Sequence, residues 1–160
     1  MLKRLLAGAW KGSPRFLRRA GVWLTQPRFT VTAGVVVSDE RGRVLLLRHT
    51  LRGGSGWGIP GGFIGKGEQP DEAVRREVRE ETRLELEEVE LAFVRTLRHA
   101  QQVECIFRGR MRAASIGRQE SSFEVERAEW FERARLPADL GHDQRRLIER
   151  ALGDGAKRAE

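Results

Sequence analysis

Residues 62–84 read GFIGKGEQPDEAVRREVREETRL and join a glycine-rich loop to a strongly acidic segment. Pro70 suits the first position of a helix, where its missing N–H costs nothing. Asp71 and Glu72 follow in what would be the first turn, where they complement the positive end of the helix dipole. The pattern therefore predicts a helix over residues 70–82.

On this helix Glu77, Glu80 and Glu81 share one face, because at about 100° per residue they fall within an arc of about 100°. Arg75 and Arg79 lie almost opposite and are poorly placed to neutralise them. Carboxylates roughly 5 Å apart repel by about 3 kcal/mol per pair at an effective dielectric of about 20. A solvated acidic face would explain the helix taken alone. A bound Mg²⁺ or Mn²⁺, which prefers hard oxygen ligands, is the functional alternative.

The loop before the helix holds eight of the 18 glycines, all between residues 53 and 67. Such a concentration is typical of backbone that approaches a ligand closely. Residues 56–61, GWGIPG, match GxGxxG, but Pro60 and the glycines after it prevent the helix start that dinucleotide binding requires. Lys66 is followed by Gly67 rather than Ser or Thr, so a P-loop is also excluded.

Loop and helix together resemble the Nudix box, written G-x5-E-x7-R-E-U-x-E-E-x-G-U with U an aliphatic residue. Eight of its nine specified positions match over residues 62–84, and the order of expected strands and helices resembles the family from residue 29 to residue 152. The segment WGIPGG at 57–62 also resembles the approach to that box. The matching residues are Gly62, Glu68, Arg76, Glu77, Val78, Glu80, Glu81 and Leu84.

The resemblance implies an α/β (α+β) fold, an α/β/α sandwich with a mixed β-sheet. It also implies Mg²⁺-dependent hydrolysis of a nucleoside diphosphate linked to another moiety X, such as a nucleotide sugar or an ADP-ribose-like compound. Glu80 and Glu81 would be the main metal ligands, and Glu77 a third ligand or the group that orients the attacking water. Mn²⁺ is an alternative metal.

Two further parts of the box receive roles from the same resemblance. Glu68 would add a carboxylate near the metal and form an ion pair with Arg76, which fixes the loop to the helix. The carbonyl of Gly61 is a further candidate ligand, and the backbone of Gly61 and Gly62 would border the substrate.

The ninth position of the box departs from the family, because Arg83 replaces its usual glycine. This glycine lies just past the helix, where a left-handed conformation is common, and a non-glycine residue there costs on the order of 1 kcal/mol. We expect the helix to close differently in this chain. The departure follows all the carboxylates, so we expect it to affect stability more than metal binding.

Family members often recruit another acid from a later segment as a ligand or base. Glu120, Glu124 and Glu126 are the candidates, and Glu124 is favoured because it precedes the strand expected around Trp130. A solvated strand face explains the same three residues.

Two residues beside the loop are candidates for substrate contact. Arg48, with His49, could bind phosphate, although an exposed strand end would show the same residues. Trp57 could stack on a base or wedge the loop. His99, Gln101 and Gln102 are expected at the pocket rim, whereas His142 near a helix start reads as a surface or capping residue.

The remaining pattern predicts one domain over residues 29–152, with a leader at 1–28 and a frayed tail at 153–160. A hairpin is expected from strands at 30–38 and 44–48, with further strands at 89–97, 103–111 and 128–131. Val103, Cys105 and Phe107 alternate toward one face, which makes Cys105 a core residue rather than a nucleophile. A C-terminal helix should bury Leu147, Ile148, Ala151 and Leu152.

The net charge of +7 is concentrated in the leader. Residues 1–30 carry seven basic and no acidic side chains, so the remaining chain is balanced and offers no basic groove for nucleic acid. The leader reads as two amphipathic helices separated by a break at residues 12–14. Their apolar faces would pack on the body or on a second subunit, or would lie on an anionic membrane, where each basic residue contributes about 1 kcal/mol.

A single cysteine excludes an internal disulfide framework, and residues 1–10 lack a cleavage signature. We therefore expect a cytoplasmic protein, with peripheral membrane contact as the alternative. Other activities stay open: hydrolysis of nucleoside triphosphates or dinucleoside polyphosphates, removal of a 5′ pyrophosphate from RNA, and a non-catalytic ligand-binding module.

Overall fold

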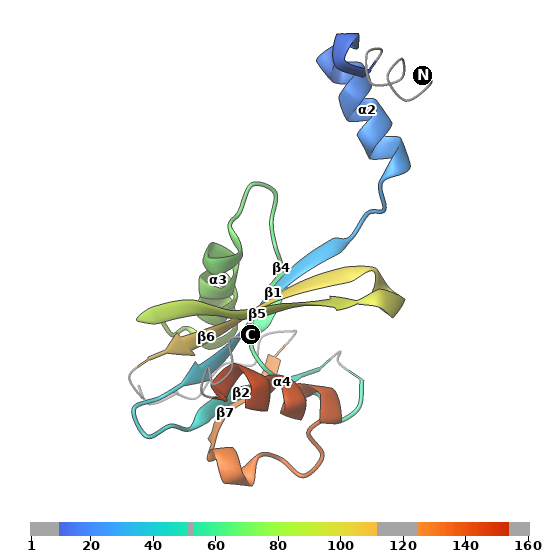
Figure 1. The fold of residues 1–160 in the computed structure, drawn as a ribbon. Coiled ribbons are helices and arrows are strands. Elements are labelled where there is room, and N and C mark those ends of the chain that lie inside the picture. Colours follow the sequence, from blue (N-terminus) through green and yellow to red (C-terminus); the bar gives the residue numbers. More distant parts are fainter. Residues whose placement is uncertain (1–9, 51–52, 112–124, 154–160) are drawn as a thin grey trace, which may run out of the picture.

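The computed structural model describes residues 10–50, 53–111 and 125–153. Its centre is a seven-stranded sheet in the order β3-β2-β1-β6-β5, with β4 added to β1 and β7 added to β2 (Figure 1). The strands are β1 Thr30–Ser38, β2 Val44–His49, β3 Trp57–Gly58, β4 Gly61–Phe63, β5 Glu88–Leu97, β6 Gln102–Arg110 and β7 Val125–Phe131. The α-helices are α2 Arg15–Thr25, α3 Pro70–Thr82 and α4 His142–Leu152, and short 3₁₀ helices span Arg98–Ala100 and Arg133–Arg135.

The sheet is mixed, as the resemblance implies. β1 runs parallel to β6 from the pair Thr30 and Gln102 to the pair Ser38 and Arg110, whereas every other pairing is antiparallel. The predicted hairpin of β1 and β2 is present, but the two strands pair only at its turn, at Ser38 and Val44. Beyond the turn β2 pairs with β7 and β3, which leaves β1 free to pair with β4.

The two faces of the sheet are covered by different helices, which gives the expected α/β/α sandwich (Figure 1). Alternate residues of β1 point to opposite faces: Val35 and Val37 join the core under α3, and Val36 joins the core under α4. The helix α3 is buried through Ala73, Val74 and Val78, and α4 through Leu147, Ile148 and Ala151.

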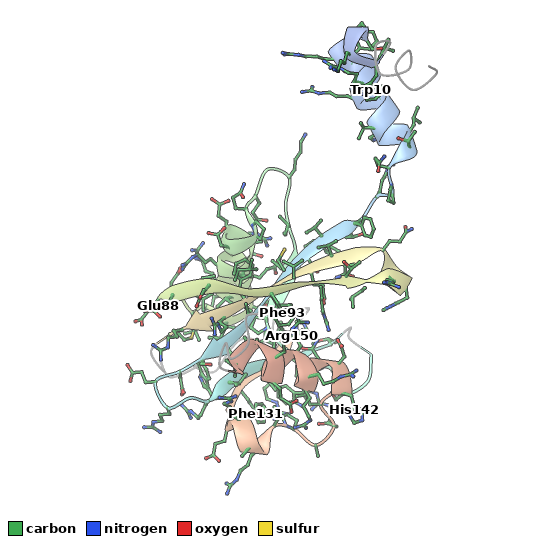
Figure 2. All side chains as sticks on the ribbon, in the orientation of Figure 1. Trp10, Glu88, Phe93, Phe131, His142 and Arg150 are labelled. Atoms are coloured by element: carbon green, nitrogen blue, oxygen red, sulfur yellow. The ribbon has the colours of Figure 1, made fainter. Side chains whose placement is uncertain are left out.

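A contact outside the core ties α4 to β5. The guanidinium of Arg150 lies 4.0 Å from the ring centroid of Phe93, and Figure 2 shows the two side chains together. A cation over an aromatic face is attracted by the ring quadrupole. This pair therefore helps to hold α4 against β5.

The leader forms the second of its two expected helices, α2, and Figure 1 shows it standing apart from the sheet. No residue of α2 is buried, so its apolar side chains do not pack on the part of the body that the structure describes. Most of the first expected helix and of the tail lies outside the described residues. None of the helices described is long and apolar enough to cross a membrane.

Candidate active site

Arg76 of α3 gathers three carboxylates around one guanidinium. Its Nε and Nη2 donate to both oxygens of Glu68, at 2.8 and 3.1 Å, which confirms the expected ion pair between loop and helix. Its Nη1 donates to Glu77 at 2.8 Å and to Glu80 at 3.4 Å. A further bond from Nη2 to the carbonyl of Phe63, at 3.1 Å, ties the same guanidinium to β4.

The electrostatics of this group follow from its hydrogen bonds. The bonds from Arg76 and then from the Gly65 N–H lower the pKa of Glu68, and they outweigh its partial desolvation. The same carboxylates raise the pKa of Arg76, Glu68 first and then Glu77. The lowered pKa keeps Glu68 ionised near neutral pH.

Two carboxylates of α3 touch the backbone of the glycine loop. The side chain of Glu81 is 10% exposed, and its Oε2 accepts a bond from the Gly61 N–H at 3.2 Å. Glu77 lies against Gly62, where an added Cβ would stand 2.4 Å from Oε1. Gly61 has φ +151°, and a Cβ there would meet the Ala33 carbonyl oxygen at 2.4 Å. Both positions therefore require glycine: Gly62 leaves room for the Glu77 carboxylate, and Gly61 leaves room for the backbone of the paired strand β1.

The donor set fits a hard divalent cation. The side chains of Glu68, Glu77 and Glu80 already converge on one positive charge, that of Arg76. Each would offer a metal ion carboxylate oxygens, which are the ligand atoms that Mg²⁺ and Mn²⁺ prefer. Within the residues described, however, no three acidic, histidine or cysteine side chains are close enough together to hold an ion. These carboxylate oxygens would be the protein ligands of such an ion.

A cavity of about 230 Å³ lies on the α4 face of the sheet, directly behind this loop. Gly61 and Gly62 line it, and they are the same two residues that touch Glu81 and Glu77. The loop backbone thus separates the cavity from the carboxylates by one chain thickness. Its other walls are Thr32, Ala33, Gly34, Ile59, Pro60, Phe63, Gln102, Glu104, Ile106, Gln144 and Leu147.

A family model described as the NUDIX domain matches residues 28–151. This chain belongs to the Nudix family. No curated protein matches the sequence.

Solved structures of Nudix proteins share the fold. A MutT NUDIX hydrolase from Burkholderia pseudomallei is 27% identical, with a TM-score of 0.65 over 78% of this chain and 98% of that one. The NUDIX domain of Shewanella oneidensis NrtR, complexed with ADP ribose, is 22% identical, with a TM-score of 0.63 over 82% and 95% of the two chains. A UDP-X diphosphatase is 17% identical, with a TM-score of 0.56 over 94% and 78%.

The cavity of this Nudix domain has a polar wall that the sequence did not reveal. Glu104 accepts a 2.5 Å bond from Arg95, whose guanidinium also forms a two-bond pair with Asp143 of α4. The bond to Asp143, and then the bond to Glu104, raise the pKa of Arg95 against its desolvation. The available signal was an acidic residue two positions before Ile106, and therefore on the same face of the strand, next to Cys105 that packs against the core.

Two amides complete this wall. Gln102, expected at the rim, donates to the Thr32 hydroxyl at 2.8 Å, and Gln144 accepts from the Ile59 N–H at 3.2 Å. Gln144 was not identified from the sequence, because α4 carries several polar residues and no pattern distinguishes this one from the others. The pocket therefore presents amide and carboxylate groups beside the apolar side chains of Ile59, Ile106 and Leu147.

The other predicted substrate contacts lie around β2 and β3. Arg48 forms an ion pair with Glu126 at 3.4 Å, and the Nδ1 of His49 is 3.9 Å from Glu81. Trp57 is only 7% exposed and packs edge-to-face on Phe131 at 5.1 Å, which matches the loop-wedge alternative. Glu120 and Glu124 lie outside the described residues.

The departure at Arg83 has a definite geometry. Arg83 has φ 59° and ψ 17°, and its N–H bonds to the Arg79 carbonyl at 2.9 Å. The expectation that the helix closes differently is wrong, because arginine adopts the left-handed conformation that the family's glycine takes easily. Cys105 packs against the α3-side core, where burial raises the pKa of its thiol, as expected of a core residue.

Proposed function

We propose that this Nudix domain is a Mg²⁺-dependent pyrophosphohydrolase that cleaves a nucleoside diphosphate linked to another moiety X. The proposal rests on the position of Gly61 and Gly62 between the cavity and the carboxylates. One side of this backbone borders the cavity, and the other contacts Glu77 and Glu81. A nucleoside bound in the cavity would bring its diphosphate to Gly61 and Gly62, next to the carboxylates.

Glu80, Glu81 and Glu77 are the proposed metal ligands, with Glu68 and the Gly61 carbonyl as further oxygen donors. When bound, the ion would neutralise the diphosphate and lower the pKa of the attacking water. Arg76 keeps the loop in register with α3 through its bonds to Glu68 and Phe63.

The attacking water must be oriented and must lose a proton to a carboxylate. Glu77 is the proposed orienting group, because its position is fixed by Arg76 on one side and Gly62 on the other. Glu124 is the proposed later acid, as a ligand or base. Arg48, on β2 beside the glycine-rich loop, would contact a phosphate of the substrate.

The substrate class is supported by the polar wall of the cavity and by the ligands named for two relatives, ADP ribose and UDP-X. A wall containing Glu104, Gln102 and Gln144 can accept hydrogen bonds from the N–H groups of a nucleobase. The balanced charge of residues 31–160 argues against a nucleic-acid substrate.

The test is a panel of nucleoside diphosphate conjugates, triphosphates and dinucleoside polyphosphates, each assayed with Mg²⁺ and with a chelator. Conjugates should be cleaved to a nucleoside monophosphate and X-phosphate, and the chelator should abolish turnover. Glu80→Gln should lower kcat/KM by roughly 10²-fold or more, because it removes a charged oxygen donor.

Glu85→Gln is the matched control, since Glu85 pairs with Arg79 rather than facing the loop. It should retain full activity. Preferred release of pyrophosphate from triphosphates would replace the proposed substrate class by the triphosphate alternative. Tight binding without turnover of any compound would identify a binding module and refute the enzymatic proposal.

A further inference from the structure

The helix α2 carries an uncovered apolar face, here called the apolar arc and defined as Phe16, Leu17, Ala20, Trp23 and Leu24. At about 100° per residue these side chains span an arc of about 120°. The exposed fractions of its four large members lie between 51% and 73%. Large apolar side chains gathered on one exposed face are typical of an interaction surface.

The side of α2 opposite the apolar arc carries its three arginines together with Val22. Arg15, Arg18 and Arg19 occupy the side away from the apolar arc, and Arg28 lies 3.9 Å over the ring of Trp23 just after the helix. Trp10 lies against the helix at Gly21, and Figure 2 shows it on the leader, far from the sheet. Because residues 1–30 contain no acidic side chain, nothing in this segment neutralises the arginines.

We propose that α2 is a membrane-surface anchor, which places its apolar arc in the headgroup boundary of an anionic bilayer and its arginines against lipid phosphates. A short basic helix with tryptophan and leucine on one face has the composition that binds such interfaces. The charge of the leader complements an anionic surface, and its screening by salt gives the contact a measurable signature.

Two other partners fit this surface less well. A second copy of α2 would bring the same uncompensated positive charge alongside. A nucleic acid would use the arginines, but it would leave Leu17 and Leu24 in water.

The test is co-sedimentation of the full chain with vesicles containing roughly one-third phosphatidylglycerol, beside pure phosphatidylcholine vesicles. We expect binding to the anionic vesicles at about 0.05 M salt and at least a tenfold weaker partition at about 0.5 M. Trp23→Ala/Leu24→Ala should weaken binding about tenfold or more, because it removes apolar area from the arc.

Val22→Ala is the matched control, because Val22 lies on the basic side of the same helix, and it should bind like the parent chain. Both variants should keep the parent melting temperature and hydrolytic rate, since no residue of α2 is buried. Bromine-labelled lipid should quench the tryptophan fluorescence of the parent chain, and this quenching should be reduced in the double variant.

Four outcomes would overturn the proposal. One is no binding to anionic vesicles at low salt, and another is binding that the double variant does not weaken. The third is equally tight binding to a single-stranded RNA probe with no loss in the double variant. The last is a dimer in solution that the double variant abolishes, without any vesicle binding.

Discussion

The carboxylate of Glu77 occupies the space that a side chain on Gly62 would need. An added Cβ would stand 2.4 Å from Oε1 and 2.9 Å from Oε2 of Glu77, while Arg76 holds Oε1 from the other side at 2.8 Å. Glycine at position 62 is therefore required for the Glu77 carboxylate to occupy this place, and a substitution can test this requirement directly.

Gly62→Ala should displace Glu77 and lower kcat by about 10²-fold, since a shift of about 1 Å in a positioned group can have that effect. The melting temperature should change little, because the clashing atoms are the end of a flexible side chain. Gly53→Ala is the control, as a Cβ there meets nothing within 4 Å. Steady-state kinetics that leave Gly62→Ala as active as Gly53→Ala would show that Glu77 does not need this position.

Arg83→Gly should raise the free energy of unfolding by about 1 kcal/mol, because it relieves a left-handed backbone conformation. Arg83→Ala removes the same side chain but keeps the strain, so its stability should match that of the parent. Urea titrations of the three proteins would separate these effects. A tenfold gain in turnover by Arg83→Gly without a stability change would contradict the interpretation.

Asp39 stabilises the turn between β1 and β2, and its contribution should depend on pH. Burial acts to raise the pKa of Asp39, but hydrogen bonds from the Arg43 backbone and side chain and from the Arg41 backbone bring it below 3.8. A lowered folded-state pKa gives stability that is present above pH 3.8 and is lost as the pH falls through the folded-state value.

Asp39→Asn should therefore cost about 1–3 kcal/mol near neutral pH, with the difference from the parent shrinking in acid below pH 3.8. Asp139→Asn, at an exposed position, should leave stability unchanged. Thermal unfolding across the acid range provides the measurement. A constant difference at every pH would mean that the charge of Asp39 is not involved.

Glu104→Gln should raise KM for the nucleotide about tenfold while kcat changes less. The reason is that Glu104 lines the cavity and is not one of the carboxylates around Arg76. Arg95 would keep its pair with Asp143, so the fold should persist. Glu90→Gln removes an exposed carboxylate on the neighbouring strand β5 and should have no effect. A fall in kcat alone would place Glu104 in the chemistry rather than in binding.

Local patterns predicted α3, α4 and the longer strands, whereas the short strands β3 and β4 inside the glycine-rich loop were not expected. Pro70, the acidic first turn and the apolar spacing of Val74 and Val78 specify α3 within one continuous segment, so its bounds were correct. The alternation of Val103, Cys105 and Phe107 placed β6 with the correct face toward the α3-side core. Such signals are carried by neighbours in sequence.

Features that depend on distant segments were missed. The place of Glu104 on the cavity wall follows from the parallel pairing of β6 with β1, which no local pattern specifies. The position of Gln144 depends on how α4 packs on the sheet. The helix was wrongly expected to close differently at Arg83, because Arg83 takes the left-handed conformation although a residue with a Cβ disfavours it.

The strand β1 has a consequence for how the protein becomes active during folding. Its residues 32–34 pair with β4, which contains Gly61 and Gly62, and also with residues 104–106 of β6. The bond between Gln102 and Thr32 closes a loop of 70 residues. Contacts so distant in sequence form slowly, because the entropy of loop closure must be overcome first. After refolding, the return of hydrolysis should follow the slowest folding phase.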